Sequence, residues 1–166
     1  MKIFLVGFMG CGKSHWGKIW AEHGKLPFVE LDILIEEREH KTIATVFEEK
    51  GEPYFRKVES DVLKSYTRGG SWIMSAGGGT PCFFDNMEWM NQQGTTVYLK
   101  ASPQLLAQRL FAEKDQRPVL KNVPDSELEN FITKKLEERE VFYNKARFVV
   151  NAATINVSSI SALQLA

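Results

Sequence analysis

The sequence has few cysteines and no long apolar run. Its two cysteines, Cys11 and Cys82, are too few and too far apart for a disulfide framework or a zinc site. They suit a reducing compartment, and we expect a cytoplasmic protein. The apolar residues 1–9 are interrupted by glycine and favour a buried strand over a signal peptide, and no other stretch approaches the ~20 apolar residues of a membrane span. We therefore expect no membrane partner.

Neither sign of charge is in excess. The chain has 21 Lys and Arg against 21 Asp and Glu, so no basic surface indicates a nucleic-acid partner. The histidines, at positions 15, 23 and 40, lack the spacing of metal ligands. A length of 166 residues fits one domain over residues 1–166. We expect a monomer that acts on small molecules.

Short apolar runs alternate with longer segments of helical period, which is typical of an α/β domain with a mainly parallel sheet. Five strands are predicted. They cover residues 3–6, 28–31, 72–75, 96–99 and 148–150, the last with an extension at 155–157.

Three helices are also predicted. The first covers about 12–23 and stops at Gly24, and the second begins at Ser102, a favoured cap. The third covers about 125–146, with Asp125 or Ser126 as its cap, and buries one apolar face. Its inner-face residues are Leu128, Phe131, Ile132, Leu136 and Phe142. The polar segment 113–124 lacks periodicity and is expected to be a mobile loop, while 158–166 form a brief helix at most.

Residues 7–14, Gly-Phe-Met-Gly-Cys-Gly-Lys-Ser, match the phosphate-loop pattern Gly-x-x-x-x-Gly-Lys-Ser between a predicted strand and a predicted helix. The glycines allow amide groups to point at phosphate oxygens, and the helix N-terminus adds positive charge. Lys13 would reach the β- and γ-phosphates of ATP, and the Ser14 hydroxyl would hold Mg²⁺. A plain glycine-rich turn is the weaker alternative. The predicted ATP-binding residues here are Gly10, Cys11, Gly12, Lys13, Ser14 and His15.

The sequence disfavours one class of phosphate-loop protein, the GTPase switches. The Asp-x-x-Gly and Asn-Lys-x-Asp motifs of GTPase switches do not occur in the sequence.

Cys11 lies at the predicted helix start beside Lys13, and we expect it to be a reactive thiol.

Further motifs follow the phosphate loop in a fixed order. They are Glu30-Leu31-Asp32, the segment 47–56 (Phe-Glu-Glu-Lys-Gly-Glu-Pro-Tyr-Phe-Arg) with Glu59, the segment 75–79 (Ser-Ala-Gly-Gly-Gly), Arg117-Pro118, and Arg139. In order and spacing they resemble the shikimate kinase family, a branch of the nucleoside-monophosphate-kinase-like proteins, over residues 2–157. The resemblance implies a three-layer α/β phosphate-loop kinase fold, with helices flanking a central five-stranded parallel sheet. It also implies transfer of the γ-phosphate of MgATP to the 3-hydroxyl of shikimate, in aromatic amino-acid biosynthesis.

The resemblance assigns roles to individual residues. Asp32 would orient the acceptor hydroxyl or take its proton, and its place after the second strand is where ligands of such sheets gather. The alternative is a helix cap. Arg56 and Arg139 would bind the shikimate carboxylate, for which the guanidinium fork is suited. The alternative for each arginine is a surface ion pair.

The acceptor region is expected over about 32–60, with further contacts from the glycine segment. Gly77, Gly78 and Gly79 would present backbone N–H groups to shikimate, although a tight turn could also explain them. Phe47 and Phe55 would wall the shikimate ring, or belong to the core.

The remaining assignments concern the nucleotide side. Arg117, in a lid of about residues 113–124, would contact the transferred phosphate, and the predicted catalytic residues are Asp32, Lys13 and Arg117. Arg109 would stack on adenine, with a solvated helix arginine as the alternative. Glu30, where many relatives have Asp, and Ser75 would contact Mg²⁺ through water. The segment 151–154 lacks an arginine and a proline found in some relatives, which leaves base selectivity open.

Two other functions stay open. One is a kinase of another small acceptor, such as gluconate or a nucleoside monophosphate, and the other is a nucleotide-binding regulatory module that lacks catalysis. Arg56, the glycine segment 77–79 and Arg139 favour a compact, carboxylated acceptor. Lys13, Ser14, Asp32 and Arg117 are the parts that catalysis requires, and they disfavour the regulatory module.

Overall fold

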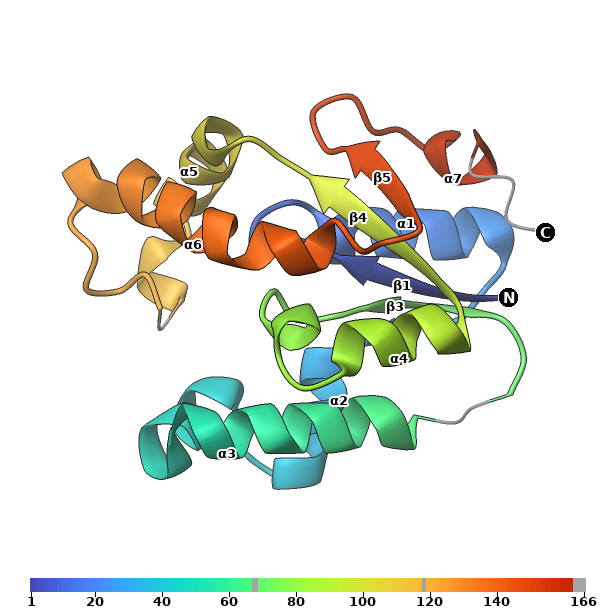
Figure 1. Ribbon diagram of the computed structural model, residues 1–166, viewed down its shortest axis with the longest axis horizontal. Coiled ribbons are helices and arrows are strands. Elements are labelled where there is room, and N and C mark those ends of the chain that lie inside the picture. The colour runs from blue at the N-terminus through green and yellow to red at the C-terminus, as the bar shows by residue number, and fades with distance from the viewer. Residues whose placement is uncertain (67–68, 118, 163–166) are drawn as a thin grey trace.

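The computed structural model describes residues 1–66, 69–117 and 119–162. A parallel sheet of five strands, in the order β2-β3-β1-β4-β5, forms its centre (Figure 1). The strands are β1 Lys2–Val6, β2 Phe28–Glu30, β3 Trp72–Ser75, β4 Thr95–Lys100 and β5 Phe148–Asn151. The predicted fold class and the five predicted strands are confirmed.

Helices cover both faces of this sheet (Figure 1). They are α1 Lys13–Gly24, α2 Leu31–Glu39, α3 Ile43–Ser65, α4 Asn86–Gln93, α5 Pro103–Phe111, α6 Leu128–Tyr143 and α7 Ser159–Ala162. The handedness of the crossovers explains the two layers of helices. The connection from β1 to β2 runs toward one edge of the sheet, and the connections from β3 to β4 and from β4 to β5 run toward the other edge. Since parallel crossovers are right-handed, connections in opposite directions lie on opposite faces. This places α1 on one face and α4 and α6 on the other. No helix in the described part of the chain is long and apolar enough to cross a membrane.

Several predicted boundaries need correction. The extension of β5 at 155–157 is wrong, because residues 152–154 form a turn in which the amides of Ala153 and Thr154 donate to Asn151. Helix α1 includes Gly24, and Lys25 takes the left-handed conformation after it (φ 52°). Helix α6 begins after a 3₁₀ turn, so neither Asp125 nor Ser126 caps it. Residues 163–166 of the predicted C-terminal helix lie outside the described part.

The second predicted helix is confirmed, and three helices were missed. The hydroxyl of Ser102 accepts from the amide of Leu105 at 3.2 Å, as expected of a cap. The sequence patterns did not predict α2, α3 or α4. In α6 the predicted inner face is only partly right, since Leu128, Ile132 and Leu136 are buried but Tyr143 replaces Phe142 as the fully buried aromatic residue near its end.

The register of the sheet brings three loops together. Ser75 of β3 lies opposite Leu5 of β1 on one side and Glu30 of β2 on the other. The carboxyl ends of these strands therefore meet at one edge, which is where open α/β sheets bind ligands. The phosphate loop follows β1, α2 follows β2 and the glycine segment 77–79 follows β3.

Candidate active site

The phosphate loop curls tightly between β1 and α1. Gly7 has a φ of 142°, and a Cβ atom there would lie 2.8 Å from the carbonyl oxygen of Leu99, so a side chain cannot be accommodated. The Lys13 ammonium donates to the carbonyl oxygens of Gly7 at 2.8 Å and Phe8 at 3.0 Å. The lysine is thus held within the loop that precedes it.

Arg109 ties the phosphate loop to α5. Its Nη1 donates to the carbonyl oxygens of Gly10 and Cys11, each at 3.2 Å. The alternative of a solvated arginine is therefore wrong. Cys11 is fully buried, which contradicts the expectation of a reactive thiol, because a reagent must reach the sulfur.

A large cavity of about 710 Å³ lies in front of the phosphate loop. Nearly all of the residues predicted for the nucleotide side line it. They are Gly10, Gly12, Lys13, Ser14, His15, Ser75, Arg109 and Arg117.

A second cavity, of about 220 Å³, adjoins the first. All of the residues predicted for the acceptor side line it: Asp32, Phe47, Phe55, Arg56, Gly77, Gly78, Gly79 and Arg139. Both cavities are lined by Met9, Asp32, Gly77, Gly78 and Arg117. The two predicted groups of residues therefore meet at a common boundary that includes a carboxylate and a guanidinium group.

Asp32 lies in the first turn of α2, where a negative charge is favourable. The cap position is Glu30, so Asp32 does not cap this helix. Burial raises the pKa of the Asp32 carboxyl, and the Lys13 ammonium opposes this rise. Water reaches the carboxylate through the cavities, while protein atoms surround it at longer range.

Arg56 is a buried arginine, not a surface one. Its Nη1 donates to Glu59 at 2.9 Å and its Nε to Glu52 at 3.2 Å, and its guanidinium carbon lies 4.3 Å from the ring centre of Phe83. Glu59 also accepts from the Thr80 hydroxyl at 2.7 Å. Burial raises the pKa of the Glu59 carboxyl, and the Arg56 charge opposes this. The network fixes the guanidinium plane at the cavity wall.

Arg139 is also buried, but its environment differs. Its guanidinium carbon lies 5.5 Å from the ring centre of Phe8. Within the described residues, no carboxylate forms an ion pair with it. A buried charge without a protein counter-ion is costly, so an anionic ligand in the adjoining cavity would stabilise it.

Arg117 lines both cavities, and its partner Glu113 lines the nucleotide-side cavity with it. Its Nη2 and Nε donate to the Glu113 carboxylate at 2.7 and 3.2 Å. Lys114 next to this pair forms an ion pair with Asp125 at 2.7 Å. Pro118, which follows Arg117 in the predicted motif, lies outside the described residues.

Two predicted site residues, the buried Cys11 and Glu30, line neither cavity. Glu30 instead pairs through its carboxylate with Lys18, at 2.9 Å. Ser75, its partner in the sheet register, does line the nucleotide-side cavity. Glu30 therefore lies one strand away from the predicted metal position.

Comparison with known proteins matches these features to one family. The sequence profile described as shikimate kinase matches residues 9–165. The shikimate kinase of Bacteroides thetaiotaomicron is 45% identical over 152 residues, which cover 92% of this chain and 87% of that protein. The chain belongs to the shikimate kinase family. Its members are kinases, so this chain is an ATP-dependent phosphotransferase.

Solved structures of shikimate kinases have the same fold. The crystal structure from Bacteroides thetaiotaomicron gives a TM-score of 0.91 at 43% identity, covering 99% of this chain and 96% of that one. A shikimate kinase from Acinetobacter baumannii, in complex with shikimate, gives 0.85 at 30% identity, with 98% and 89% covered.

The segment predicted to face adenine, residues 151–154, lies beside the nucleotide-side cavity. Ala152, Ala153 and Ile155 line the nucleotide-side cavity with small or aliphatic side chains. Trp16 of α1 lines the same cavity. The surface offered to a base here is largely apolar.

Two site residues were missed because their partners are distant in sequence. Tyr143, fully buried, donates from its hydroxyl to the carbonyl oxygen of Gly78, 65 positions away. Thr80, also fully buried, orients Glu59. A buried polar group must find a partner, but sequence alone does not say which one.

Proposed function

We propose that this chain transfers the γ-phosphate of MgATP to the 3-hydroxyl of shikimate, giving shikimate 3-phosphate and ADP. The observation that carries the proposal is the common boundary of the two cavities, where Asp32 and Arg117 line both. Phosphoryl transfer needs an acceptor hydroxyl in line with a terminal phosphate, and this boundary joins a phosphate loop to a cavity that carries two arginines.

On the nucleotide side, Lys13 and the amides of residues 10–15 bind the β- and γ-phosphates. Lys13 then exchanges the carbonyl oxygens of Gly7 and Phe8 for phosphate oxygens, which carry full charge. Arg109 keeps the loop against α5 through its bonds to Gly10 and Cys11. This preorganised positive charge stabilises the transferred group.

On the acceptor side, Arg56 and Arg139 bind the carboxylate of shikimate. Arg139 has no carboxylate partner among the described residues, and Arg56 is held in place by Glu59. Phe47 and Phe55, with ring centres 4.4 Å apart, face the ring of the acceptor, and Gly77, Gly78 and Gly79 let it approach the backbone.

Asp32 orients the acceptor hydroxyl at the boundary and accepts its proton as the phosphoryl group arrives. Arg117, in the lid of about residues 113–124, leaves Glu113 and contacts the transferred phosphate. This closure excludes water from the site.

Mg²⁺ fits the oxygen atoms that the nucleotide-side cavity offers. The hydroxyls of Ser14 and Ser75 line it, and Mg²⁺ prefers oxygen ligands and retains several waters. Ser14 would hold the ion directly and Ser75 through water, while Glu30, which pairs with Lys18 and lines neither cavity, stays outside this set. When bound with ATP, Mg²⁺ neutralises charge on the β- and γ-phosphates.

We also propose that the protein is one domain that works as a monomer in the cytoplasm, with ATP and shikimate as partners and neither nucleic acid nor membrane. Residues of one chain line both cavities, and the balanced charge offers no basic surface. The acceptor region covers about residues 32–60.

A coupled ADP-release assay tests the proposed function. Purified protein with MgATP is offered shikimate, quinate, gluconate and nucleoside monophosphates. Activity with shikimate well above all others is expected. Turnover of gluconate or a nucleoside monophosphate in its place would identify the other kinase, and ATP binding without turnover of any acceptor would identify the regulatory module.

A further inference from the structure

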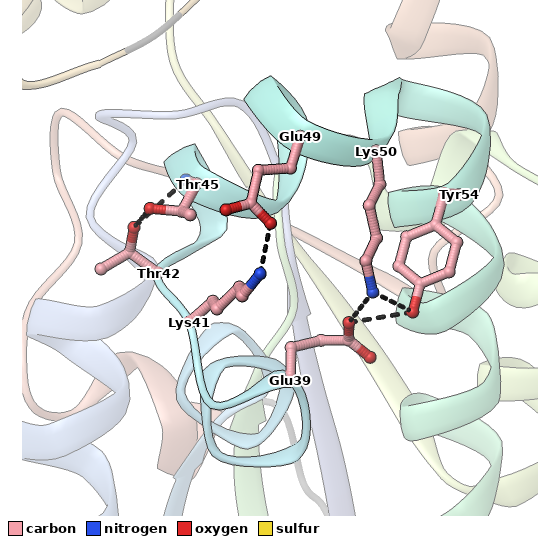
Figure 2. A network of polar contacts seen from close by, with 7 residues as sticks. All are labelled: Glu39, Lys41, Thr42, Thr45, Glu49, Lys50 and Tyr54. Atoms are coloured by element: carbon pink, nitrogen blue, oxygen red, sulfur yellow. Dashed lines mark hydrogen bonds and ion pairs between the residues drawn. The ribbon is translucent and has the colours of Figure 1, made fainter.

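A cluster of three side chains joins α2 to both halves of α3 (Figure 2). Lys50 donates to Glu39 at 3.3 Å and to the Tyr54 hydroxyl at 2.9 Å, and that hydroxyl donates to Glu39 at 2.9 Å. The Lys50 ammonium also lies 4.2 Å from the centre of the Tyr54 ring. Each member of this cluster, Glu39–Lys50–Tyr54, therefore contacts the other two.

The cluster spans a break in α3. Gly51 has φ 79° and ψ 170°, which are not helical, so the residues before and after it form two segments that meet at an angle. Lys50 ends the first segment and Tyr54 belongs to the second, while Glu39 ends α2. Helical hydrogen bonds do not fix the angle at such a break, so side-chain contacts must do so.

The two segments carry different walls of the acceptor cavity. Phe47 lies on the first segment, and Phe55 and Arg56 lie on the second. Asp32 lies at the opposite end of α2 from Glu39. The angle at Gly51, and the position of α2 against it, therefore set where Arg56 and Phe47 lie relative to Asp32.

None of the three cluster residues lines the acceptor cavity, although residues before and after them in the sequence do. The Glu39 side chain is only 9% exposed, because Lys50 and Tyr54 cover it. The hydrogen bond from Tyr54 lowers the pKa of the Glu39 carboxyl, and the same hydroxyl raises the pKa of Lys50. Both charges are thus present at neutral pH and the cluster is intact there.

We propose that Glu39, Lys50 and Tyr54 are positioning residues for acceptor binding, which fix the angle of α3 at Gly51 and thereby the distance between Arg56 and Asp32. The role of the cluster in acceptor binding rests on the proposed function. Its role in holding the two segments of α3 together does not.

Tyr54→Phe is the decisive variant, because it removes the hydroxyl and both of its hydrogen bonds while the ring still lies against Lys50. We expect the KM for shikimate to rise about three- to tenfold, the range that corresponds to the net contribution of one ordinary hydrogen bond, because the lost bonds act on the acceptor only through the position of α3. The KM for ATP and kcat should change less than about twofold. Glu39→Gln should have a similar effect, and the double variant should be no worse than the stronger single one, since both remove one cluster.

Glu49→Gln is the matched control. Glu49 pairs with Lys41 in the same region (Figure 2), but this pair reaches only the first segment of α3. Its kinetics should match the wild type. If Tyr54→Phe left the KM for shikimate unchanged, or changed it no more than Glu49→Gln, the positioning role would be wrong.

Hydrogen exchange separates failure of this inference from failure of the proposed function. Without substrate, amides of residues 47–55 should exchange faster in Tyr54→Phe than in the wild type, and those of α6 should not. Equal exchange at 47–55 overturns the inference even if shikimate is the acceptor. A wild-type enzyme that does not phosphorylate shikimate overturns the proposed function, and the exchange data still decide whether the cluster holds α3.

Discussion

The hydroxyl group of Tyr143, near the end of α6, donates a hydrogen bond to the carbonyl oxygen of Gly78, in the loop after β3. Burial raises the pKa of Tyr143 far above the usual range of a tyrosine, and the nearby positive charge of Arg139 opposes this rise. The hydroxyl therefore remains protonated and can donate at any physiological pH. It joins the glycine segment to α6, the helix that carries Arg139.

Tyr143→Phe should weaken both stability and acceptor binding. The carbonyl oxygen of Gly78 loses its side-chain donor in a part-buried hydrogen bond, which should lower the free energy of unfolding by about 0.5–1.5 kcal/mol. The KM for shikimate should rise because the glycine segment, which lines the acceptor cavity, is less well held. Urea unfolding and steady-state kinetics measure the two effects.

Tyr98→Phe is the control for this pair. Tyr98 stacks on Tyr143 with ring centres 5.1 Å apart, but its hydroxyl bonds Glu140 at 3.2 Å and not the glycine segment. It should leave the KM for shikimate unchanged. Equal changes in KM for both variants would contradict a specific role of the bond to Gly78.

Gly79→Ala should displace Arg56. A Cβ atom at Gly79 would lie 2.4 Å from Nη2 of Arg56, although the backbone of Gly79 (φ −90°) suits alanine well. The effect should therefore come from the guanidinium group and not from backbone strain. We expect the KM for shikimate to rise about tenfold or more, as for loss of a paired arginine contact. The KM for ATP should remain unchanged.

Gly69→Ala is the matched glycine control, since a Cβ atom there has no neighbour within 4 Å. It should behave as the wild type in the same assay. A normal KM in Gly79→Ala would show that Arg56 can move without loss and does not bind the acceptor.

The pH dependence of kcat/KM should report the ionisation of Asp32. The base must be deprotonated to act, so activity is lost as pH falls through its pKa. Burial raises that pKa above the ordinary 3.8, hence the acid limb should lie above pH 3.8. Glu36 adds to the rise, and Glu36→Gln should move the limb to lower pH while its side-chain oxygen still accepts from the amide of Ile43. A limb that stays in place would exclude Asp32 as the titrating group.

Asp32→Asn should lower turnover but raise thermal stability at neutral pH. Turnover should fall about a hundredfold or more, with little change in the affinity for ATP. A carboxyl with a raised pKa favours the folded state when protonated and loses that contribution as pH rises above 3.8 through the folded-state pKa. Removing the charge should therefore raise Tm at pH 7 but not at pH 3. A lower Tm at pH 7 would contradict the raised pKa.

The strands were predictable because buried parallel strands consist of continuous apolar runs. Residues 3–6 of β1 are all fully buried, and no other arrangement hides such a run as well. Helix α3 was not predictable in this way. Gly51 and Pro53 normally end a helix, and here packing of Phe47 against Phe55 joins the segments on either side. Tertiary contacts overrule the local signals at that point.

The residues of the proposed site were predictable where a sequence motif fixes the backbone. They were less predictable where contacts between distant parts of the chain determine which side chains belong to the site. The phosphate loop needs its glycines for backbone geometry, so its pattern is local. The predictions for Arg56 and Arg139 came from resemblance, and the structure places both at the same cavity. Thr80 and Tyr143 carry no local signal, because their hydroxyls act on residues that only the fold brings near.

Arg109→Lys separates two roles of this arginine. If Arg109 acts through the carbonyl oxygens of Gly10 and Cys11, the variant loosens the phosphate loop, and the KM should rise by the same factor, about three- to tenfold, for ATP, GTP and CTP. If it acts by stacking on the base, the factor should depend on the base. Gln104→Ala, which removes an exposed bond from the same helix to Glu129, is the control and should change none of these values. Because Arg109 bonds two successive carbonyls of the loop, we expect the KM to rise by equal factors for the three nucleotides. A rise in KM confined to ATP would show that Arg109 does not act through the loop.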